Sequence, residues 1–362
     1  MIELLKRIVI ISVIALVISV TIGALLSPFG WGDSTFYTKS KYFLDNQEKF
    51  NGVYVGGSLE YRHIDPYVID SIVQQKGIDL RSFNLGNDGY NLPLQVWVTE
   101  NLMSKAGDNL KYIFLSLSSD PLFYKGILHT KEWNYWQNTK SVIFSIRVMY
   151  QMDIPSKTKR QFSRFYLNSL AENVLKFGMM DDLIQFHAKP VLADSLYLGH
   201  RKNGYFPYDD EERYLTLRND LPEEIVSKMQ NNELSKIDYQ QNQLKRDSLE
   251  LLWGNSFATY VPGTPAVPLY LSTYLDLHKR CEEMDIKLIF VMPPKGRTDY
   301  KLLQAIYERL PEDSKINLAD PRVYPEFFTV ENGYNYHHMN AKGSEVYSKK
   351  LGQKIASLLA KP

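Results

Sequence analysis

Three short apolar runs, each ending in a glycine-rich or serine-rich turn, constrain the fold of this chain more than any other feature. The runs are Val53–Val55, Leu80–Leu85 and Tyr112–Leu117, and segments with helical patterning follow them. Strands that alternate with helices favour a parallel sheet covered by helices. In such sheets ligands bind at the carboxyl ends of the strands, where these three polar turns fall.

The same alternation returns near the end of the chain. Two further strands are predicted at Ile286–Met292 and Ile316–Leu318. Amphipathic patterns predict helices that surround these strands, at Leu269–Met284, Tyr300–Leu310 and Ala341–Ala360. The sequence therefore predicts a three-layer α/β/α domain with a parallel sheet of about five strands.

The middle of the chain, about Leu122–Val267, shows helical and loop signals without a convincing strand. It is too long for an ordinary connection between two strands. We therefore expect a large helical insertion there, with helices at Ser141–Met152, Phe165–Phe177 and in the charged stretch Pro222–Trp253. The predicted organisation is an anchor at residues 1–28 and one α/β domain at 29–362 that carries this insertion, with an aromatic, polar connector at Gly30–Lys49.

An uncharged apolar run, Ile8–Leu26, follows Lys6 and Arg7 and is long enough to cross a bilayer. Basic residues on its N-terminal side place that side in the cytoplasm and the rest of the chain outside. We expect an uncleaved single-pass transmembrane helix with the main domain in the periplasm or on the cell surface. A cleaved signal peptide is the alternative, although no small-residue cleavage pattern stands out before Ser27.

The composition is that of a globular protein, with 44% hydrophobic residues, 23% charged residues and a net charge of +1. The balanced charge implies no nucleic acid or other polyanion as a partner. Tyrosine and phenylalanine are plentiful, which suits core packing and also sugar-stacking surfaces. No Cys/His/Asp spacing indicates a metal site, no cofactor is implied, and the single cysteine, Cys281, cannot form an internal disulfide.

Ser58 stands at the tip of the turn that follows the first strand, after Gly56 and Gly57. A helix is expected slightly later, at Tyr67–Gln75, with Asp65 as its cap and Pro66 in its first turn. A serine on a strand-to-helix turn exposes its hydroxyl, and neighbouring backbone N–H groups can face an oxyanion. A structural turn with an ordinary serine is the alternative interpretation.

Four short blocks, in chain order, resemble those of the SGNH (GDSL) hydrolase superfamily. Gly56-Gly57-Ser58-Leu59 resembles its nucleophile block. The other three are the loop from Asn84 to Gly89, Ser118-Ser119-Asp120, and the block from Asn335 to Gly343. The last block is the most specific, because His338, Asn340 and Gly343 keep their spacing. The resemblance covers roughly residues 51–120 and 286–362 and implies a flavodoxin-like sheet.

The resemblance implies a role for each matched residue. Ser58 would be the nucleophile, His338 the general base and Asn335 the group that orients the imidazole. The oxyanion and the substrate would be held by the backbone N–H groups of Ser58 and Gly89 together with residues of the two middle blocks: Asn84, Asp88 and Ser119.

Three positions depart from the family pattern. Gly57 replaces the aspartate before the serine, which is not a reacting group. Asn335 stands where the family has an acid; an asparagine can orient an imidazole but cannot stabilise an imidazolium by charge. Ser119 replaces an asparagine oxyanion donor, and loss of one such donor costs about a hundred- to a thousand-fold in rate. These changes predict a slow or specialised enzyme, or a site that binds without turnover.

Other residues have competing interpretations. His337 is an alternative base, although the register with Asn340 favours His338. Asp88 is an alternative source of the missing carboxylate. His63 would reach a substrate anion or, as the plainer alternative, serve as a solvated or capping residue. Three aromatic residues would face a glycan or simply pack: His129, Trp133 and Trp136. The basic cluster is expected to be a solvated helix face: Lys157, Lys159, Arg160 and Arg164.

The expected function is that of a membrane-anchored, extracytoplasmic serine esterase or O-acyltransferase. Its substrate would be an acyl ester, acetyl above all, on an envelope glycan or a similar component. By analogy of layout with membrane-anchored members of the superfamily, a membrane-bound O-acyltransferase is a candidate partner. The alternatives are a catalytically weak or inactive accessory protein that binds a polysaccharide or that acyltransferase, and a simple secreted esterase.

Overall fold

A computed structural model of the 362-residue chain describes residues 2–27, 29–118, 134–151, 155–176, 179–188, 195–216, 267–294, 300–335 and 337–360, and isolated positions between 223 and 237. The chain divides into two compact units, Met1–Lys41 with Pro121–Asp194, and Tyr42–Asp120 with Ser195–Pro362. The predicted insertion at 122–267 is thus shared between the units, since the segment from Ser195 onward belongs with the sheet. The part of the insertion that spans residues 238–266 lies outside the described residues.

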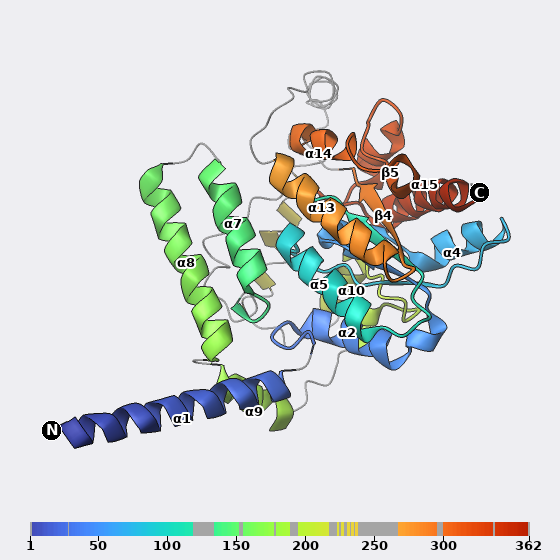
Figure 1. Ribbon diagram of the computed structural model, residues 1–362. Coiled ribbons are helices and arrows are strands. Elements are labelled where there is room, and N and C mark those ends of the chain that lie inside the picture. The colour runs from blue at the N-terminus through green and yellow to red at the C-terminus, as the bar shows by residue number, and fades with distance from the viewer. Residues whose placement is uncertain are drawn as a thin grey trace. The chain divides into compact units, whose positions relative to one another are not determined.

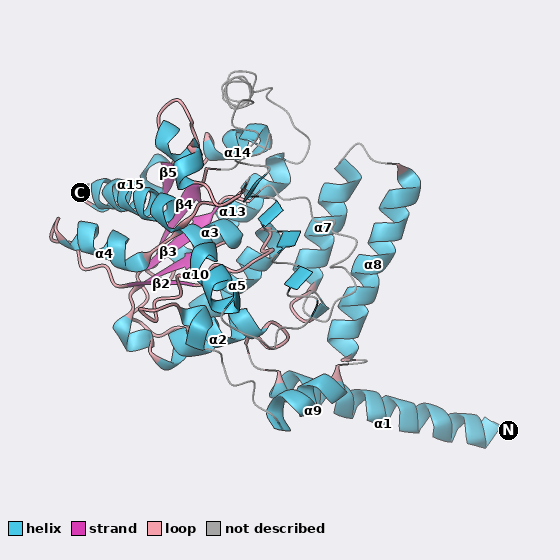
Figure 2. Ribbon diagram, turned by 180° about the vertical axis from the view of Figure 1, so that it is seen from behind, coloured by secondary structure: helices cyan, strands magenta, loops and turns pink. Residues whose placement is uncertain are grey.

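The second unit is built on a five-stranded parallel sheet, as predicted (Figure 2). Its strands are β1 (Gly52–Val55), β2 (Ser82–Asn84), β3 (Tyr112–Ser116), β4 (Lys287–Met292) and β5 (Lys315–Asn317). The strand order is β2-β1-β3-β4-β5, so the chain reverses direction across the sheet after β2. The strands are short apolar runs buried from both faces, which is typical of a parallel sheet between two helical layers.

Helices cover both faces of this sheet, which confirms the predicted α/β architecture (Figure 1). Helix α5 (Leu92–Lys105) packs on α13 (Val267–Glu282), and α13 contacts α14 (Tyr300–Tyr307). Helix α4 (Pro66–Gln74) packs on the last helix, α15 (Ala341–Leu359). The core between the layers is apolar, with Val53, Ile113 and Leu288 fully buried in adjacent strands.

Two helices of this part of the chain differ from the sequence prediction. Helix α3 (Ser58–His63) begins at the serine itself, where we expected a loop before the next helix. Helix α2 (Ser34–Asp45) occupies most of the predicted connector, and Phe36 and Phe43, which are seven positions apart, are both buried. The expected cap of α4 is confirmed, because the Asp65 carboxylate accepts a hydrogen bond from Tyr67 N at 3.0 Å.

The short helices fill the remaining loops. These are η1 (Gln47–Lys49), η2 (Ser195–Leu198), η4 (Glu312–Ser314), η5 (Pro325–Phe328) and η6 (Val330–Asn332), together with α10 (Tyr208–Thr216). Of these, α10 and η6 adjoin the candidate site.

The first unit contains α1 (Ile2–Leu26), α7 (Thr139–Gln151), α8 (Ser156–Leu175) and α9 (Met180–Ala188). Helix α1 is long and apolar enough to cross a membrane, and most of its side chains are exposed. A cleaved signal sequence meets the same criteria of length and composition. Helix α7 packs on α8, and Trp136 is buried beside them, in line with a packing role.

Candidate active site

The turn after β1 places Ser58 as the first residue of α3. Gly57 precedes it in an extended conformation, and its N–H donates to Glu60 Oε2 at 2.8 Å. The carboxylate of Glu60 lies so close to Gly56 that a Cβ at that position would meet it at 2.3 Å. The close approach of Glu60 favours a glycine at position 56, and the half-buried Ser58 follows directly after this turn.

The Ser58 hydroxyl meets the imidazole of His338. Ser58 Oγ lies 3.0 Å from His338 Nε2, and His338 Nδ1 lies 3.0 Å from Asn335 Oδ1. Such distances allow a proton to move from the hydroxyl to the ring. The structure thus brings together Ser58, His338 and Asn335, the three residues for which we predicted the reacting roles.

The tautomer of His338 follows from the surroundings of Asn335. Asn335 Oδ1 also accepts the backbone N–H groups of His337 and His338, each at 2.9 Å. An amide nitrogen in that place would face two donors, so the atom must be the carbonyl oxygen. His338 Nδ1 therefore carries the ring proton, and the lone pair of Nε2 faces Ser58.

The segment that carries His338 is held on both sides. Tyr334 N donates to His338 O at 2.8 Å, and Gly333 and Met339 form an antiparallel bridge. Asn340 caps α15 by accepting from Gly343 N at 2.9 Å. A Cβ on Gly343 would stand 2.1 Å from Asn332 O, which explains the glycine at this position of the motif.

The imidazole of His337 is not the group that meets Ser58. The backbone N–H of His337 donates to Asn335 Oδ1, whereas the ring that lies against Ser58 is that of His338. The spacing from Asn340 and the observed geometry thus identify the same histidine, His338.

The loop from Asn84 to Gly89 lies beside α3, and its members differ in role. Asn84 is fully buried; its amide donates to Glu60 O at 2.7 Å and Ile64 O at 2.8 Å, and its carbonyl accepts from Gly86 N at 2.8 Å. We expected Asn84 to contact substrate, but its placement is that of a residue that joins the loop to α3. Gly89 is exposed and has φ +76°, a conformation that favours glycine.

The other candidate for the acid behind His338 is Asp88. The Asp88 carboxylate binds Arg62 at 3.0 Å, so it does not supply the missing acid behind His338. Ser119 and Asp120 lie outside the described residues, as do His129 and Trp133.

A buried arginine, Arg62, contacts both the loop at Asp88 and helix α10. Its guanidinium lies 3.0 Å from the Asp88 carboxylate and 2.8 Å from that of Glu211, and it donates to Phe206 O at 3.1 Å. The rings of Tyr61 and Tyr208 stack on it at 4.1 and 4.2 Å. Burial lowers the pKa of Arg62, but the nearby carboxylates more than offset this, so the side chain stays charged.

Helix α10 packs on the imidazole of His338. The Tyr208 ring makes an edge contact with His338 at 4.8 Å and stacks on Tyr334 at 5.1 Å. The carboxylate of Asp209 accepts from Ala341 N at 2.6 Å. Burial raises the pKa of Tyr208, so its phenol stays protonated at neutral pH.

His63 has a positioning role that the sequence interpretation missed. It is 1% exposed, and its Nε2 accepts from Met339 N at 2.9 Å. Burial, and the adjacent His338 and Arg62, hold its pKa well below the usual range. The solvated or anion-binding roles that we expected for His63 are therefore wrong; it is a neutral acceptor beneath the His338 segment.

Sequence reasoning missed Arg62, Tyr208 and Glu211 because their roles depend on tertiary contacts. The acidic start of α10, Tyr208-Asp209-Asp210-Glu211, signals a helix beginning. Nothing local in the sequence indicates that this helix packs on a histidine 130 positions later.

Within the described part of the chain, no group of three or more His, Cys, Asp or Glu side chains could hold a metal ion. Cys281 is buried, which raises the pKa of its thiol to about 12 and keeps it unreactive at neutral pH. Lys157, Arg160 and Arg164 are exposed on α8, which is typical of a solvated helix face.

The chain matches no known protein-family model, and no curated protein matches it. The case for its function therefore rests on the residues and geometry of the site.

Proposed function

We propose that the protein is a serine-dependent ester hydrolase or O-acyltransferase. The observation that supports this most is the 3.0 Å separation of Ser58 Oγ and His338 Nε2, with Nε2 in the acceptor tautomer. A serine is a weak nucleophile until a base removes its proton, and histidine has a suitable pKa range for that task.

The proposed reaction has two balanced halves. Ser58 Oγ attacks the acyl carbonyl and its proton passes to His338 Nε2, while backbone N–H groups of Ser58 and Gly89 stabilise the oxyanion. The intermediate collapses, the C–O bond to the leaving alcohol breaks, and His338 returns the proton to that alcohol. Water or a second alcohol then removes the acyl group from Ser58 by the reverse steps.

Because Asn335 stands in place of an acid, we expect the protein to be a slow catalyst. It holds the productive tautomer of His338 but contributes no negative charge when the ring becomes an imidazolium. Turnover would therefore be limited by the charge that develops on His338, and the substrate would need to be well positioned.

The substrate that we propose is an acyl ester on an envelope glycan or a similar component. The proposal places α1 across the membrane and the α/β unit outside the cytoplasm, because Lys6 and Arg7 lie on the N-terminal side of the apolar stretch. A membrane-bound O-acyltransferase is the proposed source or recipient of the acyl group.

A serine-reactive fluorophosphonate tests the nucleophile. Full-length protein in detergent should be labelled, and Ser58→Ala should not; His338→Ala should label at least about a hundred-fold more slowly. Ser104→Ala, which alters an exposed serine on α5, serves as the matched control. Absence of labelling in the wild type, or equal labelling of Ser58→Ala, would contradict the proposal.

A non-catalytic accessory role is the second candidate, and the uncharged Asn335 favours it. Complementation separates the two. If Ser58→Ala restores glycan acylation in cells that lack the protein as well as the wild type does, the accessory role is correct. If only wild type restores it, the site acts as a catalyst.

A further inference from the structure

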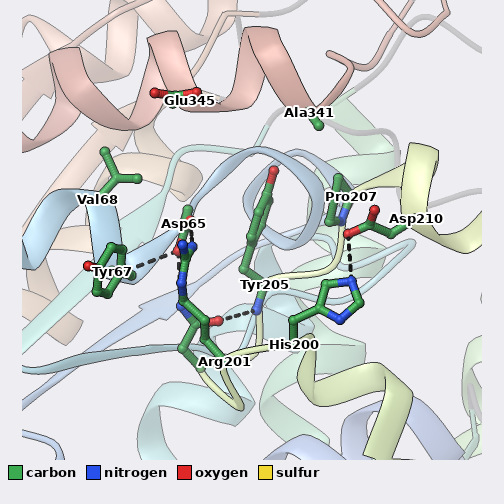
Figure 3. A pocket seen from close by; sticks show the side chains of 11 residues that line it. Asp65, Tyr67, Val68, His200, Arg201, Tyr205, Pro207, Asp210, Ala341 and Glu345 are labelled. Atoms are coloured by element: carbon green, nitrogen blue, oxygen red, sulfur yellow. Dashed lines mark hydrogen bonds and ion pairs between the residues drawn. The ribbon is translucent and has the colours of Figure 1, made fainter.

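A cavity is lined by the start of α4, by residues between His200 and Asp210, and by helix α15. It has a volume of about 510 Å³, within the range of about 300–1,000 Å³ that small-molecule pockets occupy. Figure 3 shows Asp65, Tyr67 and Arg201 on one side, His200 and Asp210 on the other, and Tyr205 between them. Helix α15 borders it through Glu345 and Ala341.

The cavity and the catalytic pair share a wall. Ala341 at the cavity rim follows His338 by three positions, and its N–H binds the carboxylate of Asp209. In α10, Tyr208 packs on His338 while Asp210 lines the cavity. On the other side, Asp65 follows the buried His63 by two positions. A ligand in this cavity is thus held by the same elements that position the base.

The polar groups at the base of the cavity are fixed before any ligand arrives. Asp65 is 5% exposed and accepts from Tyr67 N at 3.0 Å, Asn203 Nδ2 at 2.9 Å and Arg201 at 2.9 Å. Asn203 is itself 8% exposed. Burial raises the pKa of Asp65, a perturbation that is common among carboxyl groups in binding sites.

The outer part of the cavity is an accessible aromatic and polar surface. The Arg201 guanidinium stacks on Tyr67 at 4.1 Å, yet the Tyr67 residue remains 59% exposed. Arg201 and His200 keep exposed donors, and the Asp210 carboxylate lies 3.4 Å from His200 Nε2. An aromatic face beside planar donors and acceptors suits the C–H face and hydroxyl groups of a sugar ring.

The lining disfavours the other ligand classes. Among the described lining residues the aliphatic ones are Val68, Pro207 and Ala341, whose small side chains offer little surface to a long acyl chain. The carboxylates of Asp65, Asp210 and Glu345 outnumber the one permanent cation, Arg201, so an anion is repelled. Two of those carboxylates are already engaged, by Arg201 and His200, and are not free to bind a metal ion.

We propose that this cavity is a subsite for a neutral sugar unit of the glycan on which Ser58 acts. Its place in the reaction rests on the proposed function, but sugar binding does not require the serine. Occupation of the subsite would hold the glycan against α15 and α10 while the ester bond reaches Ser58.

Binding is measured by saturation-transfer NMR and calorimetry on the full-length Ser58→Ala protein in detergent, which excludes turnover. The probes are trisaccharides of glucose, galactose, mannose and N-acetylglucosamine, with an oligomer of a uronic acid for comparison. At least one neutral trisaccharide should bind. Tyr67→Ala and Arg201→Ala should each weaken that binding by about tenfold or more, as loss of a central contact does.

Two control variants test whether a loss of sugar binding is specific to the residues of the cavity. Tyr150→Ala removes a tyrosine that is 53% exposed beside Lys159, and Arg81→Ala removes an exposed arginine paired with Asp79; neither should change binding. Failure of every neutral sugar to bind, binding of the uronic acid alone, or unchanged binding in Tyr67→Ala would overturn the proposal.

Hydrolysis of p-nitrophenyl acetate separates this inference from the proposed function. This small ester needs no sugar subsite, so its hydrolysis by the wild type reports on Ser58 and His338 alone. Sugar binding without hydrolysis or labelling at Ser58 would leave the subsite standing and remove the catalytic proposal. Hydrolysis without sugar binding would support the catalytic proposal and overturn the subsite.

Discussion

Asn335 holds His338 by an oxygen that also accepts two backbone N–H groups, so its orientation does not depend on a charge. In a triad with aspartate, the carboxylate both orients the ring and stabilises the imidazolium. Here the backbone N–H groups fix Asn335, which orients the ring, but Asn335 supplies no negative charge to stabilise the imidazolium. The two contributions can therefore be separated by a single substitution.

We expect Asn335→Asp to raise the rate of fluorophosphonate labelling and of ester hydrolysis by about tenfold or more, because a carboxylate keeps the same acceptors and adds a charge. The measurement is kcat for p-nitrophenyl acetate together with the labelling rate. Asn335→Ala, which loses orientation as well, should be slower than the wild type. A variant with aspartate that is no faster would show that charge on His338 does not limit the rate.

At the scale of elements, α3, α10 and the loop at Asp88 meet on one side chain, Arg62. The guanidinium binds Asp88, next to Gly89, and stacks on Tyr208, which packs on His338. A change at Arg62 would thus move the proposed oxyanion donor and the base relative to each other, although Arg62 itself touches neither reacting atom.

Arg62→Met should lower kcat for p-nitrophenyl acetate by about ten- to a hundred-fold with little change in KM, since small displacements of catalytic groups have effects of this order. Arg62→Lys, which keeps the charge and loses the planar fork, should recover part of the rate. Arg81→Met is the control, and thermal unfolding checks that each variant folds. Wild-type kcat in folded Arg62→Met would exclude the positioning role.

The contact between α4 and β2 gives a pH dependence to stability. Asp70 accepts from Ser82 N at 2.7 Å and Ser82 Oγ at 2.6 Å, and burial raises its pKa from 3.8 to about 7. Because the folded pKa is raised, the stabilising contribution is complete below pH 3.8. It is lost progressively as the pH rises through about 7.

We expect Asp70→Asn to remove this loss, because an amide can accept from Ser82 N and donate to Ser82 Oγ. The variant should be more stable than the wild type by about 1–3 kcal/mol at pH 8, and the difference should shrink at pH 5. Urea unfolding at the two pH values measures it, with the exposed Asp79→Asn as the control. Parallel pH profiles for wild type and Asp70→Asn would refute the assignment.

The elements that the sequence predicted are those with a local signal. The strands are short buried apolar runs. The start of helix α15 is marked by its cap Asn340 and by Gly343, which lies close to the carbonyl of Asn332. Helix α3 was missed because its polar residues precede Pro66 and show no apolar period, although Tyr61 and Arg62 are buried. Helix α2 did carry a signal in the seven-residue spacing of Phe36 and Phe43.

In the site, the residues that belong to spaced sequence motifs were predictable. The residues whose roles depend on tertiary contacts were not. Ser58, His338 and Asn335 meet as their spacing within the blocks indicated. Asn84 lies in its predicted loop, but its burial and its bonds to Glu60 O and Ile64 O became apparent only in the fold. Arg62 and Tyr208 lie far apart in sequence, so no pattern connects them.

At the scale of the whole molecule, α1 is the helix by which we propose that the chain is held in the membrane. From Ile8 to Leu26 it carries no charged side chain, and most of its side chains are exposed. If it spans the bilayer as proposed, charges near its centre should prevent stable insertion, since each costs about 2.5–3.5 kcal/mol there.

We expect the wild-type chain to stay in the membrane pellet after an alkaline carbonate wash and to be released by detergent. The double variant Ile10→Arg, Ile14→Arg should shift to the soluble fraction, whereas Lys6→Arg, which keeps the flanking charge, should not. Release of the wild type by carbonate alone would point to a peripheral or processed protein.

The distance along the chain between the two reacting groups has a consequence for biosynthesis. Ser58 and His338 are 280 positions apart. The hydroxyls of Ser344 and Ser348 on the last helix bind the carbonyls of Arg62 and His63 at the end of α3. A chain that is released from the ribosome before residue 338 is made therefore has Ser58 without its imidazole partner. If the pair is catalytic as proposed, such a chain would carry no esterase activity.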